Sequence, residues 1–300
     1  MKPRVIITNL IFLLLLGSIL LPGKKETEPA VILLAVIVAI EVAYLFFYFV
    51  KKSVAVSDIC GLVYAFLLVW DVCTKHLGIG NPVLVPPPEN VMYVFYTHGG
   101  MMLEGVFSSM ELLIVGFAVS LTAGVGLGLF IGWILRLSNM FYPIVKVLAP
   151  IPSVVYTPYI IAIMPTFRSA SAMVIILGLF FPTLMQMIHR AHTIDPQIVN
   201  SARAMNVGTR DMVLRVFLPY MIPGVIGGLR VSLSTSFMIL VIAEMMGATS
   251  GLGYFIKNYA DFANYTNVIA GIILVGVVVT ILNGVITLIQ KKFVKWKMVG

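Results

Sequence analysis

Charged residues are scarce in this sequence, and their scarcity excludes an ordinary soluble domain. Only 11% of the 300 residues are charged, whereas 60% are hydrophobic; soluble domains are about a quarter charged and roughly half apolar. A soluble core could not bury so much apolar surface. A bilayer can, because each spanning helix needs about 20 mostly apolar residues and satisfies its own backbone hydrogen bonds. The composition therefore predicts an all-α polytopic membrane protein.

Cysteine is also rare, and the groups that usually perform chemistry are not clustered. Cys60 and Cys73 both fall in or at the end of one apolar segment, where they act as small hydrophobes and not as a disulfide or metal framework. His189 and His192 have no cysteine or carboxylate at metal-ligand spacing. We therefore expect no metal site and no catalytic residue. A membrane-embedded enzyme should show a clustered nucleophile, metal set or acid-base pair.

What the sequence does contain is a series of long apolar segments, separated by charged residues, proline or glycine. They predict about eight transmembrane helices, the fifth broken or kinked because its prolines remove backbone donors. The expected spans are Val5–Leu21, Ala30–Val50, Val54–Cys73, Met110–Leu135, Val147–Met164, Ala170–Ile188, Met221–Met246 and Val268–Gln290. We interpret the first as an uncleaved helix, because it is longer than a usual signal-peptide core and lacks a small-x-small cleavage site.

The net charge of +8 is explained by membrane topology, so no nucleic-acid partner is expected. We expect the chain to lie in the cell (inner or plasma) membrane with both termini in the cytoplasm. In this orientation most basic residues lie on the cytoplasmic side, as the positive-inside rule requires. The residues expected outside are Lys24, Lys25, Lys75, Arg168 and Lys257. Those expected inside are Lys2, Arg4, Lys51, Lys52, Arg136, Lys146, Arg190, Arg203, Arg210, Arg215, Lys291, Lys292, Lys295 and Lys297.

The most informative segment is the expected cytoplasmic loop 189–220. Asp195 is a good helix N-cap and Pro196 suits the first helical position. Ile198, Ala202 and Met205 recur at helical spacing, with Val199 beside them and Arg203 off that stripe, so a short amphipathic helix is predicted. Asn206 can adopt the left-handed conformation that ends such a helix. Periodicity alone is equally compatible with a helix lying in the membrane interface.

Residues on both sides of this helix carry a resemblance to a known family. Asn200-Ser201-Ala202, Asn206, Val216 and Leu218-Pro219 follow the order E-A-A-x3-G-x9-I-x-L-P, and the loop resembles the EAA loop of binding-protein-dependent ABC importer permeases. Leu148-Ala149-Pro150-Ile151-Pro152, Phe180-Phe181-Pro182 and Gly251-Leu252-Gly253 extend the likeness, from about Val54 to the C-terminus. In detail it is similar to the nitrate, sulfonate and taurine subfamily.

The resemblance implies an architecture and a set of partners. Residues 1–53 would form two extra N-terminal peripheral transmembrane helices, and 54–300 a six-helix permease core with the coupling loop at 189–220. Two permease subunits, identical or different, would alternate access for a small solute delivered by an extracytoplasmic solute-binding protein. A cytoplasmic ABC ATPase dimer would drive them and bind the ATP, since this chain lacks G-x-x-x-x-G-K-[ST] and binds no cofactor itself.

The resemblance also assigns the loop its role and exposes two departures. It implies that the helix from Asp195 to Asn206 sits in a groove on the ATPase, with Ala202, Arg203 and Met205 at the contact. Asn200 replaces the family glutamate, so a charge contact is lost or altered. Asn206 replaces the glycine, which is tolerable because asparagine is the next-best left-handed cap.

The fourth expected span carries small residues at every fourth position. Gly116, Ser120, Gly124, Gly128 and Gly132 form a stripe that lets another helix approach closely. We interpret it as a packing surface and not as a pore lining, and closely packed helices that can slide suit alternating access.

Candidates for a translocation pathway lie on the seventh span, at Ser232, Ser234, Thr235, Ser236 and Glu244. Hydroxyls can line a polar path or bond within their own helix. Glu244 is either functional or a satisfied structural carboxylate, because an ionisable group at membrane depth must be paired or reach water.

Four further carboxylates, Glu41, Asp58, Asp71 and Glu111, are scattered over three segments and are explained mostly as snorkelling or interfacial groups. An ion-coupled secondary transporter, the main alternative, should show paired intramembrane charges or corresponding broken helices in two halves. The substrate is left open among nitrate, sulfonates, taurine, bicarbonate and a heterocyclic vitamin precursor.

Overall fold

The computed structural model describes residues 3–51, 54–81 and 83–293, and over these ranges it consists of helices and connections without strands. The expectation of an all-α polytopic fold is confirmed. Lys2, Lys52, Lys295 and Lys297 lie outside the described residues. The helices are α1 Pro3–Leu20, α2 Val31–Lys51, α3 Val54–Asp71, α4 Pro88–Thr97, α5 Gly99–Trp133, α6 Leu135–Leu148, α7 Ser153–Ile163, α8 Phe167–His192, α9 Pro196–Ala204, α10 Thr209–Asp211, α11 Leu218–Gly247, α12 Leu252–Asp261 and α13 Tyr265–Phe293, with π-helical turns η1 Val72–His76 and η2 Met212–Phe217.

Six helical stretches among the described residues are long and apolar enough to cross a membrane. They are Val31–Val50, Ala55–His76, Gly99–Trp133, Phe167–His192, Thr209–Gly247 and Tyr265–Lys292. The apolar helix Arg4–Leu20 is shorter than these. The expected fifth span, Val147–Met164, corresponds to α7 and the last two residues of α6, and α6 with α7 forms a bent pair that meets at 95°. The rest of α6 was not predicted. The bend falls at Pro150 and Pro152, which lie between the two helices and cannot continue a helical hydrogen-bond ladder.

The expected external loop from Thr74 to Ser109 is largely helical, which the sequence interpretation missed. It contains most of η1, all of α4 and the beginning of α5. In η1, Leu77 N donates to Val72 O at 2.9 Å, which inserts one extra residue into the turn. Pro88 begins α4 at the position where a missing backbone donor costs nothing.

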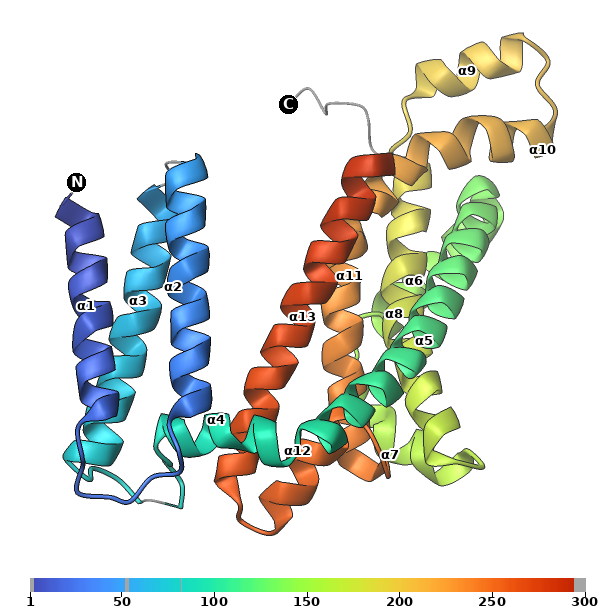
Figure 1. Cartoon of the computed structure of the whole chain (residues 1–300). Coiled ribbons are helices and arrows are strands. Elements are labelled where there is room, and N and C mark those ends of the chain that lie inside the picture. Colours follow the sequence, from blue (N-terminus) through green and yellow to red (C-terminus); the bar gives the residue numbers. More distant parts are fainter. Residues whose placement is uncertain (1–2, 52–53, 82, 294–300) are drawn as a thin grey trace. The chain divides into compact units, whose positions relative to one another are not determined.

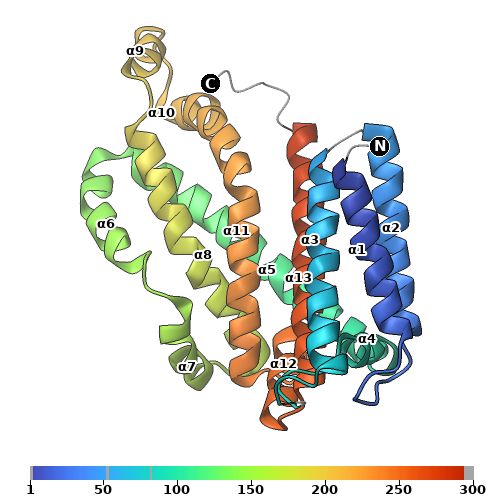
Figure 2. The same cartoon turned by 90° about the vertical axis from the view of Figure 1, so that its left-hand side faces the viewer.

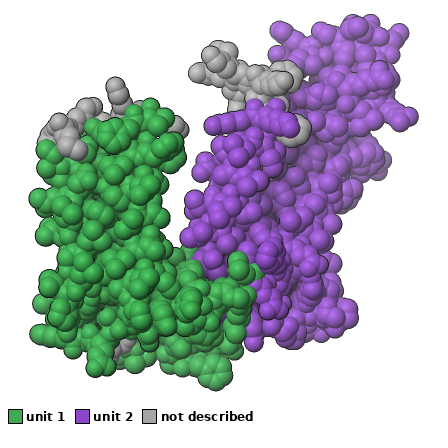
Figure 3. Space-filling model, viewed as in Figure 1, with its two compact units in different colours: residues 1–103, 256–273 green, residues 104–255, 274–300 purple. Residues whose placement is uncertain are grey.

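The chain divides into two compact units (Figure 3). Unit 1 comprises residues 1–103 and 256–273, and unit 2 comprises 104–255 and 274–300. Within unit 1, α3 packs on α1 and α2, where Leu15, Ile37 and Tyr64 share one buried cluster. The expected division at residue 53, between two peripheral helices and a permease core, stays a prediction.

Polar groups inside unit 1 correct the interpretation that its carboxylates snorkel. Glu41 is buried and accepts a hydrogen bond from the Tyr64 hydroxyl at 2.9 Å. Asp71 is fully buried, and the Ser18 hydroxyl donates to its Oδ2. Since α1, α2 and α3 pack together, each carboxylate finds a partner from another helix instead of reaching the interface. Asp58, in contrast, is exposed and pairs with Arg4 at 3.1 Å.

A second buried group in unit 1 joins η1 to α4. Lys75 Nζ lies 2.9 Å from Glu89 Oε1 and also donates to Ile19 O at 2.7 Å. The side chains are 5% and 0% exposed. Burial raises the pKa of the Glu89 carboxyl, and the hydrogen bond from Lys75 opposes that rise. Lys75 therefore ties the end of α1 to the start of α4 through two buried contacts.

Unit 2 is arranged around α8, which packs against α6, α7 and α11. Its main core includes Leu113, Ile175, Phe237 and Leu240, which are almost inaccessible to solvent. In Figures 1 and 2, α9 and α10 extend beyond the ends of α8 and α11, whereas α7 lies at the opposite end of α8. Glu111 also belongs to this unit, where it is exposed and pairs with Arg168. The segment singled out in the sequence is thus a protrusion at one end of a helical bundle.

Candidate functional site

The protruding helix α9 begins where the sequence predicts. Asp195 Oδ1 accepts a hydrogen bond from Gln197 N at 2.8 Å, and Pro196 occupies the first turn. The side chain satisfies one of the amides that have no partner inside a helix, and proline lacks the amide that would otherwise stay unbonded. The start of α9 is therefore fixed locally, independently of any partner.

The end of α9 is a two-bond cap built on Asn206. Its φ is 55°, in the left-handed region. Val207 N donates to Ala202 O at 3.1 Å, and Asn206 N donates to Arg203 O at 3.0 Å. These two bonds define a Schellman cap, for which asparagine is the usual second choice after glycine. The expectation that Asn206 replaces the glycine without changing the loop's shape agrees with this geometry.

We predict different effects for two substitutions at this cap. Asn206→Ala forces an alanine into left-handed backbone and should destabilise the α9 turn by about 1 kcal/mol. Asn206→Gly should leave the turn as stable as before. Amide hydrogen exchange in α9, measured by mass spectrometry on the chain in lipid nanodiscs, checks both, and equal protection in the two variants would contradict the prediction.

The two faces of α9 have different surroundings. Ala202 is only 8% exposed and lies in a cluster with Met187, Ile194 and Phe217 of the same unit. Because the Ala202 side chain packs against its own chain, it presents little surface to another subunit, and the contact expected there stays a prediction. Met205, in contrast, is 78% exposed. The exposed members of the expected coupling segment are Asp195, Pro196, Ile198, Asn200, Ser201, Arg203, Met205 and Asn206, and Val199 is half-buried.

The stripe of small residues on α5 lies against α8 within unit 2. A Cβ atom at Gly116 would come within 2.8 Å of Ile175 Cγ2, and one at Gly124 within 2.9 Å of Thr183 Cβ. Ser120 Oγ donates to Ile176 O at 3.0 Å. Gly128 and Gly132 likewise face Met187 and Ala191. All five positions thus face α8, and four of them lack the Cβ that would hold the helices apart.

Glu244 joins three parts of unit 2 at the other end of α11. It is 1% exposed, accepts a bond from Ser109 Oγ at 2.7 Å, and accepts another from Gly253 N at 2.8 Å. Leu252 N donates to the same serine hydroxyl at 2.9 Å. Both carboxylate oxygens have partners, so of the two roles considered for Glu244 the geometry favours the structural one. It holds the Gly251-Leu252-Gly253 turn against α5.

Gly251 cannot be replaced at this turn without strain. Its φ is +116°, and an added Cβ would overlap the Glu244 carboxylate. We predict that Gly251→Ala lowers the unfolding free energy by about 2 kcal/mol. Gly276→Ala is the matched control, because nothing lies within 4 Å of a Cβ there. Thermal unfolding in detergent should separate the two variants, and equal midpoints would contradict this account.

The four hydroxyl residues expected to line a path do not share one surface. Ser236 is buried and donates to Ser232 O at 2.9 Å within α11, and Ser234 donates to Asn283 Oδ1 at 3.2 Å. Thr235 is exposed. Ser232 borders a hollow that also contains polar groups of α8, whereas Ser234 borders a different, mostly apolar one. Helical geometry separates neighbouring positions by about 100°, so a run of hydroxyls cannot form one lining.

Sequence reasoning missed the α8 side of this hollow. Arg190 belongs to α8, which continues to His192, whereas the sequence interpretation placed this residue in the loop. Thr183, Gln186 and Arg190 repeat at helical spacing in an otherwise apolar segment, and that periodicity was a signal that could have found them. No group of three or more potential metal-binding side chains occurs among the residues for which the structure gives positions.

The fold and the small-residue packing define a multi-spanning helical membrane protein, and sequence comparison defines its family. Residues 120–297 match the family model described as binding-protein-dependent transport system inner membrane component. The chain belongs to this family, whose members are transport components and not enzymes. The protein is accordingly a multi-pass inner membrane protein.

Individual relatives agree with the subfamily expected from the sequence. The chain is 28% identical to the putative aliphatic sulfonates transport permease protein SsuC of Bacillus subtilis, over 77% of this chain and 84% of the relative. It is 28% identical to the nitrate import permease protein NrtB of Leptolyngbya laminosa, over 77% and 85%. It is 22% identical to the taurine transport system permease protein TauC of Escherichia coli, over 76% and 84%.

A solved structure has the same fold. An inward-facing MetNI methionine ABC transporter chain matches with a TM-score of 0.58 and 18% identity, and the match covers 65% of this chain and 97% of that chain.

Proposed function

We propose that this chain is the permease subunit of an ATP-binding cassette importer that moves a small solute, such as nitrate, a sulfonate or taurine, into the cell by alternating access. A separate cytoplasmic ATPase dimer binds and hydrolyses ATP. An extracytoplasmic solute-binding protein delivers the solute, and two permease subunits, identical or not, form the path. Both termini lie in the cytoplasm in this proposal.

One observation carries the proposal: α9 is a rigid knob with an anchored face and a free face. Both of its ends are capped by its own residues, and Ala202 attaches it to the cluster around Met187. Ile198 and Met205 leave apolar surface exposed at the tip. A helix held in this way moves with α8 and α11, so a force applied at the tip reaches the spanning helices.

The family and the named relatives support this role, because the relatives are described as sulfonate, nitrate and taurine permeases. The alternative of an ion-coupled secondary transporter has less support. A transporter of that kind uses paired buried charges, but the buried Lys75–Glu89 pair lies in unit 1, outside the residues that match the family model. Only one bent helix pair occurs in the described part of the chain.

The test is the interaction of α9 with a co-expressed ATPase. We expect Met205→Glu to weaken the complex at least about tenfold, because it places a charge in the centre of an apolar contact. Met205→Leu is the matched control and should bind normally. The affinity of the ATPase is measured on permease that is immobilised on a surface in nanodiscs. Coupling is measured as ATP hydrolysis by the complex in the presence of a solute-loaded binding protein.

Two results would overturn the proposal. One is normal binding and coupled hydrolysis by Met205→Glu. The other is solute uptake into proteoliposomes that contain this chain without any ATPase. Chain folding is monitored by size-exclusion chromatography, so a binding defect is not confused with misfolding.

A further inference from the structure

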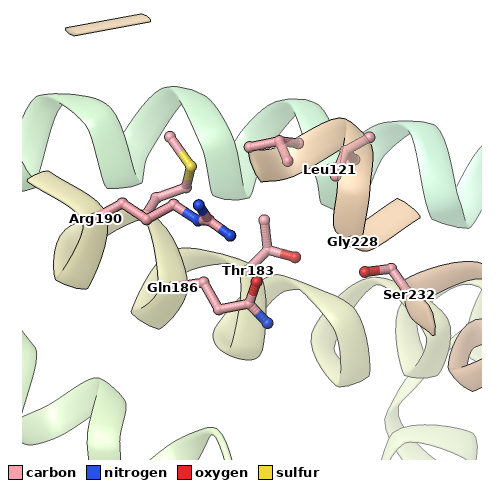
Figure 4. Close-up of a pocket in the computed structure, with 8 residues that line it drawn as sticks. Leu121, Thr183, Gln186, Arg190, Gly228 and Ser232 are labelled. Carbon is pink, nitrogen blue, oxygen red and sulfur yellow. The ribbon is translucent and has the colours of Figure 1, made fainter. Parts of the chain in front are cut away.

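A polar hollow lies among α5, α8 and α11, entirely inside unit 2 (Figure 4). Thr183, Gln186 and Arg190 of α8 border it together with Gly228 and Ser232 of α11. In Figure 4 the polar ends of Arg190, Gln186, Thr183 and Ser232 turn toward a common space. The enclosed part of this hollow is small, with room for about one water molecule. Such a gathering of polar groups in a span needs an explanation, because polar side chains are costly among apolar helices.

Helical spacing brings these groups together. Residues 183, 186 and 190 repeat at intervals of three and four on α8, and residues 228 and 232 do so on α11. The two helices pack against each other. The polar stripe of α8 therefore meets the small-residue stripe of α11 along about two turns.

Arg190 provides the only formal charge in the lining of this hollow. Its Nη2 donates to Gly224 O at 3.3 Å, and its guanidinium lies so close to Gly224 that a Cβ atom there would overlap it. No carboxylate pairs with it among the residues that the structure covers. A guanidinium has five N–H donors and cannot lose its charge, so most of its donors remain available.

The chemistry of the lining selects a class of ligand. Guanidinium donors arranged as a planar fork match the oxygens of planar or tetrahedral oxoanions, and the Gln186 amide with the Thr183 and Ser232 hydroxyls adds neutral donors. A cation would meet a fixed positive charge without a counter-charge. In the present conformation the enclosed part holds about one water molecule. A larger ion therefore enters only when side chains such as the exposed Gln186 move aside.

We propose that this hollow is an anion subsite on the solute path, in which Arg190 binds a small oxoanion such as nitrate or a sulfonate group. The inference rests on the proposed function, since it specifies the charge of the solute that the permease moves. Gly224 acts as a positioning residue, because the absence of its side chain lets the guanidinium reach the hollow.

The test uses a cysteine as a reporter inside the hollow. Cys60 and Cys73, the two native cysteines, are replaced by alanine, and Ser232→Cys is introduced into the full chain in lipid nanodiscs. Modification rates are compared for an anionic sulfonatoethyl and a cationic trimethylammonium-ethyl methanethiosulfonate reagent. With Arg190 present we expect the anionic reagent to be favoured. Arg190→Gln should lower the anionic-to-cationic rate ratio by about tenfold, because one nearby unit charge is removed.

Controls separate a local charge effect from a structural one. Ser201→Cys on the exposed part of α9 should give a ratio that does not respond to Arg190→Gln. Gly224→Ala keeps the charge of Arg190 but displaces its guanidinium. The anionic-to-cationic rate ratio should therefore fall, but less than in Arg190→Gln. Millimolar nitrate or methanesulfonate should slow modification of Ser232→Cys in the Arg190 chain and not in Arg190→Gln.

The proposal is overturned if Ser232→Cys does not react, if the ratio is independent of Arg190, or if neither anion protects. Its failure differs from failure of the proposed function, because no ATPase is needed for this measurement. Charge selectivity without ATPase coupling would leave the subsite standing and refute the importer. ATPase coupling without charge selectivity would leave the importer standing and refute the subsite.

Discussion

Gly128→Leu should separate α5 from α8 and lower the unfolding free energy by about 3 kcal/mol or more. A Cβ at position 128 would overlap the Cβ of Met187, and the backbone oxygen of Leu184, on the same helix α8, would lie 3.3 Å from it. A clash with a Cβ and with backbone cannot be relieved by rotating a flexible side chain. The helices must move apart, and the close packing along the whole stripe is lost with them.

Gly126→Leu is a matched control on the same helix. Nothing lies within 4 Å of a Cβ at Gly126, so the added side chain meets open space. Leucine also favours the helical conformation more than glycine does. We expect the control to unfold at or slightly above the temperature of the unmodified chain. Thermal unfolding in detergent, followed by fluorescence-detected size exclusion, compares the two, and similar losses would show that α5 does not pack through this stripe.

The second large effect is expected in unit 1, where Lys75→Met should cost about 3–5 kcal/mol. The change removes the partner of Glu89 Oε1 and the donor to Ile19 O while both remain buried. A buried carboxylate without a partner is far more costly than the pair was favourable. Replacing both members, as in Lys75→Met with Glu89→Leu, should restore a large part of the loss, and a double variant worse than the single one would contradict this explanation.

The Lys75→Met variant should also acquire a pH dependence of a defined sign. Burial raises the pKa of Glu89 above its ordinary value of 4.5, and the bond from Lys75 opposes this. Without Lys75 the folded chain holds the Glu89 proton more tightly than the unfolded chain does. Stability should therefore fall as the pH rises above about 4.5, until the carboxyl is ionised in the folded state as well. Unfolding midpoints measured from pH 5 to pH 8 check this prediction. If Glu89 reaches water in the variant, the midpoints will not fall over this range.

The parts of the fold that sequence predicts best are those determined by local pattern. The start of α9 follows from Asp195 and Pro196, its end from Asn206, and the bend between α6 and α7 from Pro150 and Pro152. Each of these features depends on one or two neighbouring residues. Their positions can therefore be predicted without knowledge of the tertiary contacts between helices.

The parts that sequence did not predict depend on contacts between distant segments. Glu41 and Asp71 resemble interfacial carboxylates in the sequence, yet they are buried because Tyr64 and Ser18, their partners, come from other elements. Ala202 belongs to an apolar stripe whose inward side only the tertiary structure reveals. Periodicity identifies a face of a helix but does not say which neighbour covers it.

The hollow illustrates a mixture of the two cases. The polar repeat of α8 is visible in the sequence, but the prediction that Arg190 lies in the loop hides it. Ser232 is predicted from its hydroxyl alone, together with Ser234, Thr235 and Ser236, which have other surroundings in the structure. Helical spacing separates Ser234 from Ser232, whereas Ser236 lies one turn from Ser232 and differs from it because its hydroxyl bonds within α11.

Met187 occupies a position that three regions of unit 2 share. It packs in the cluster that anchors Ala202, its Cβ faces Gly128, and it borders the hollow beside Arg190. An unbranched thioether can change its rotamers without leaving a void. This one side chain can therefore accommodate relative movement of all three regions. Rotation about its three side-chain bonds would have to take up tilting of α9, sliding of α5 along α8 and widening of the hollow.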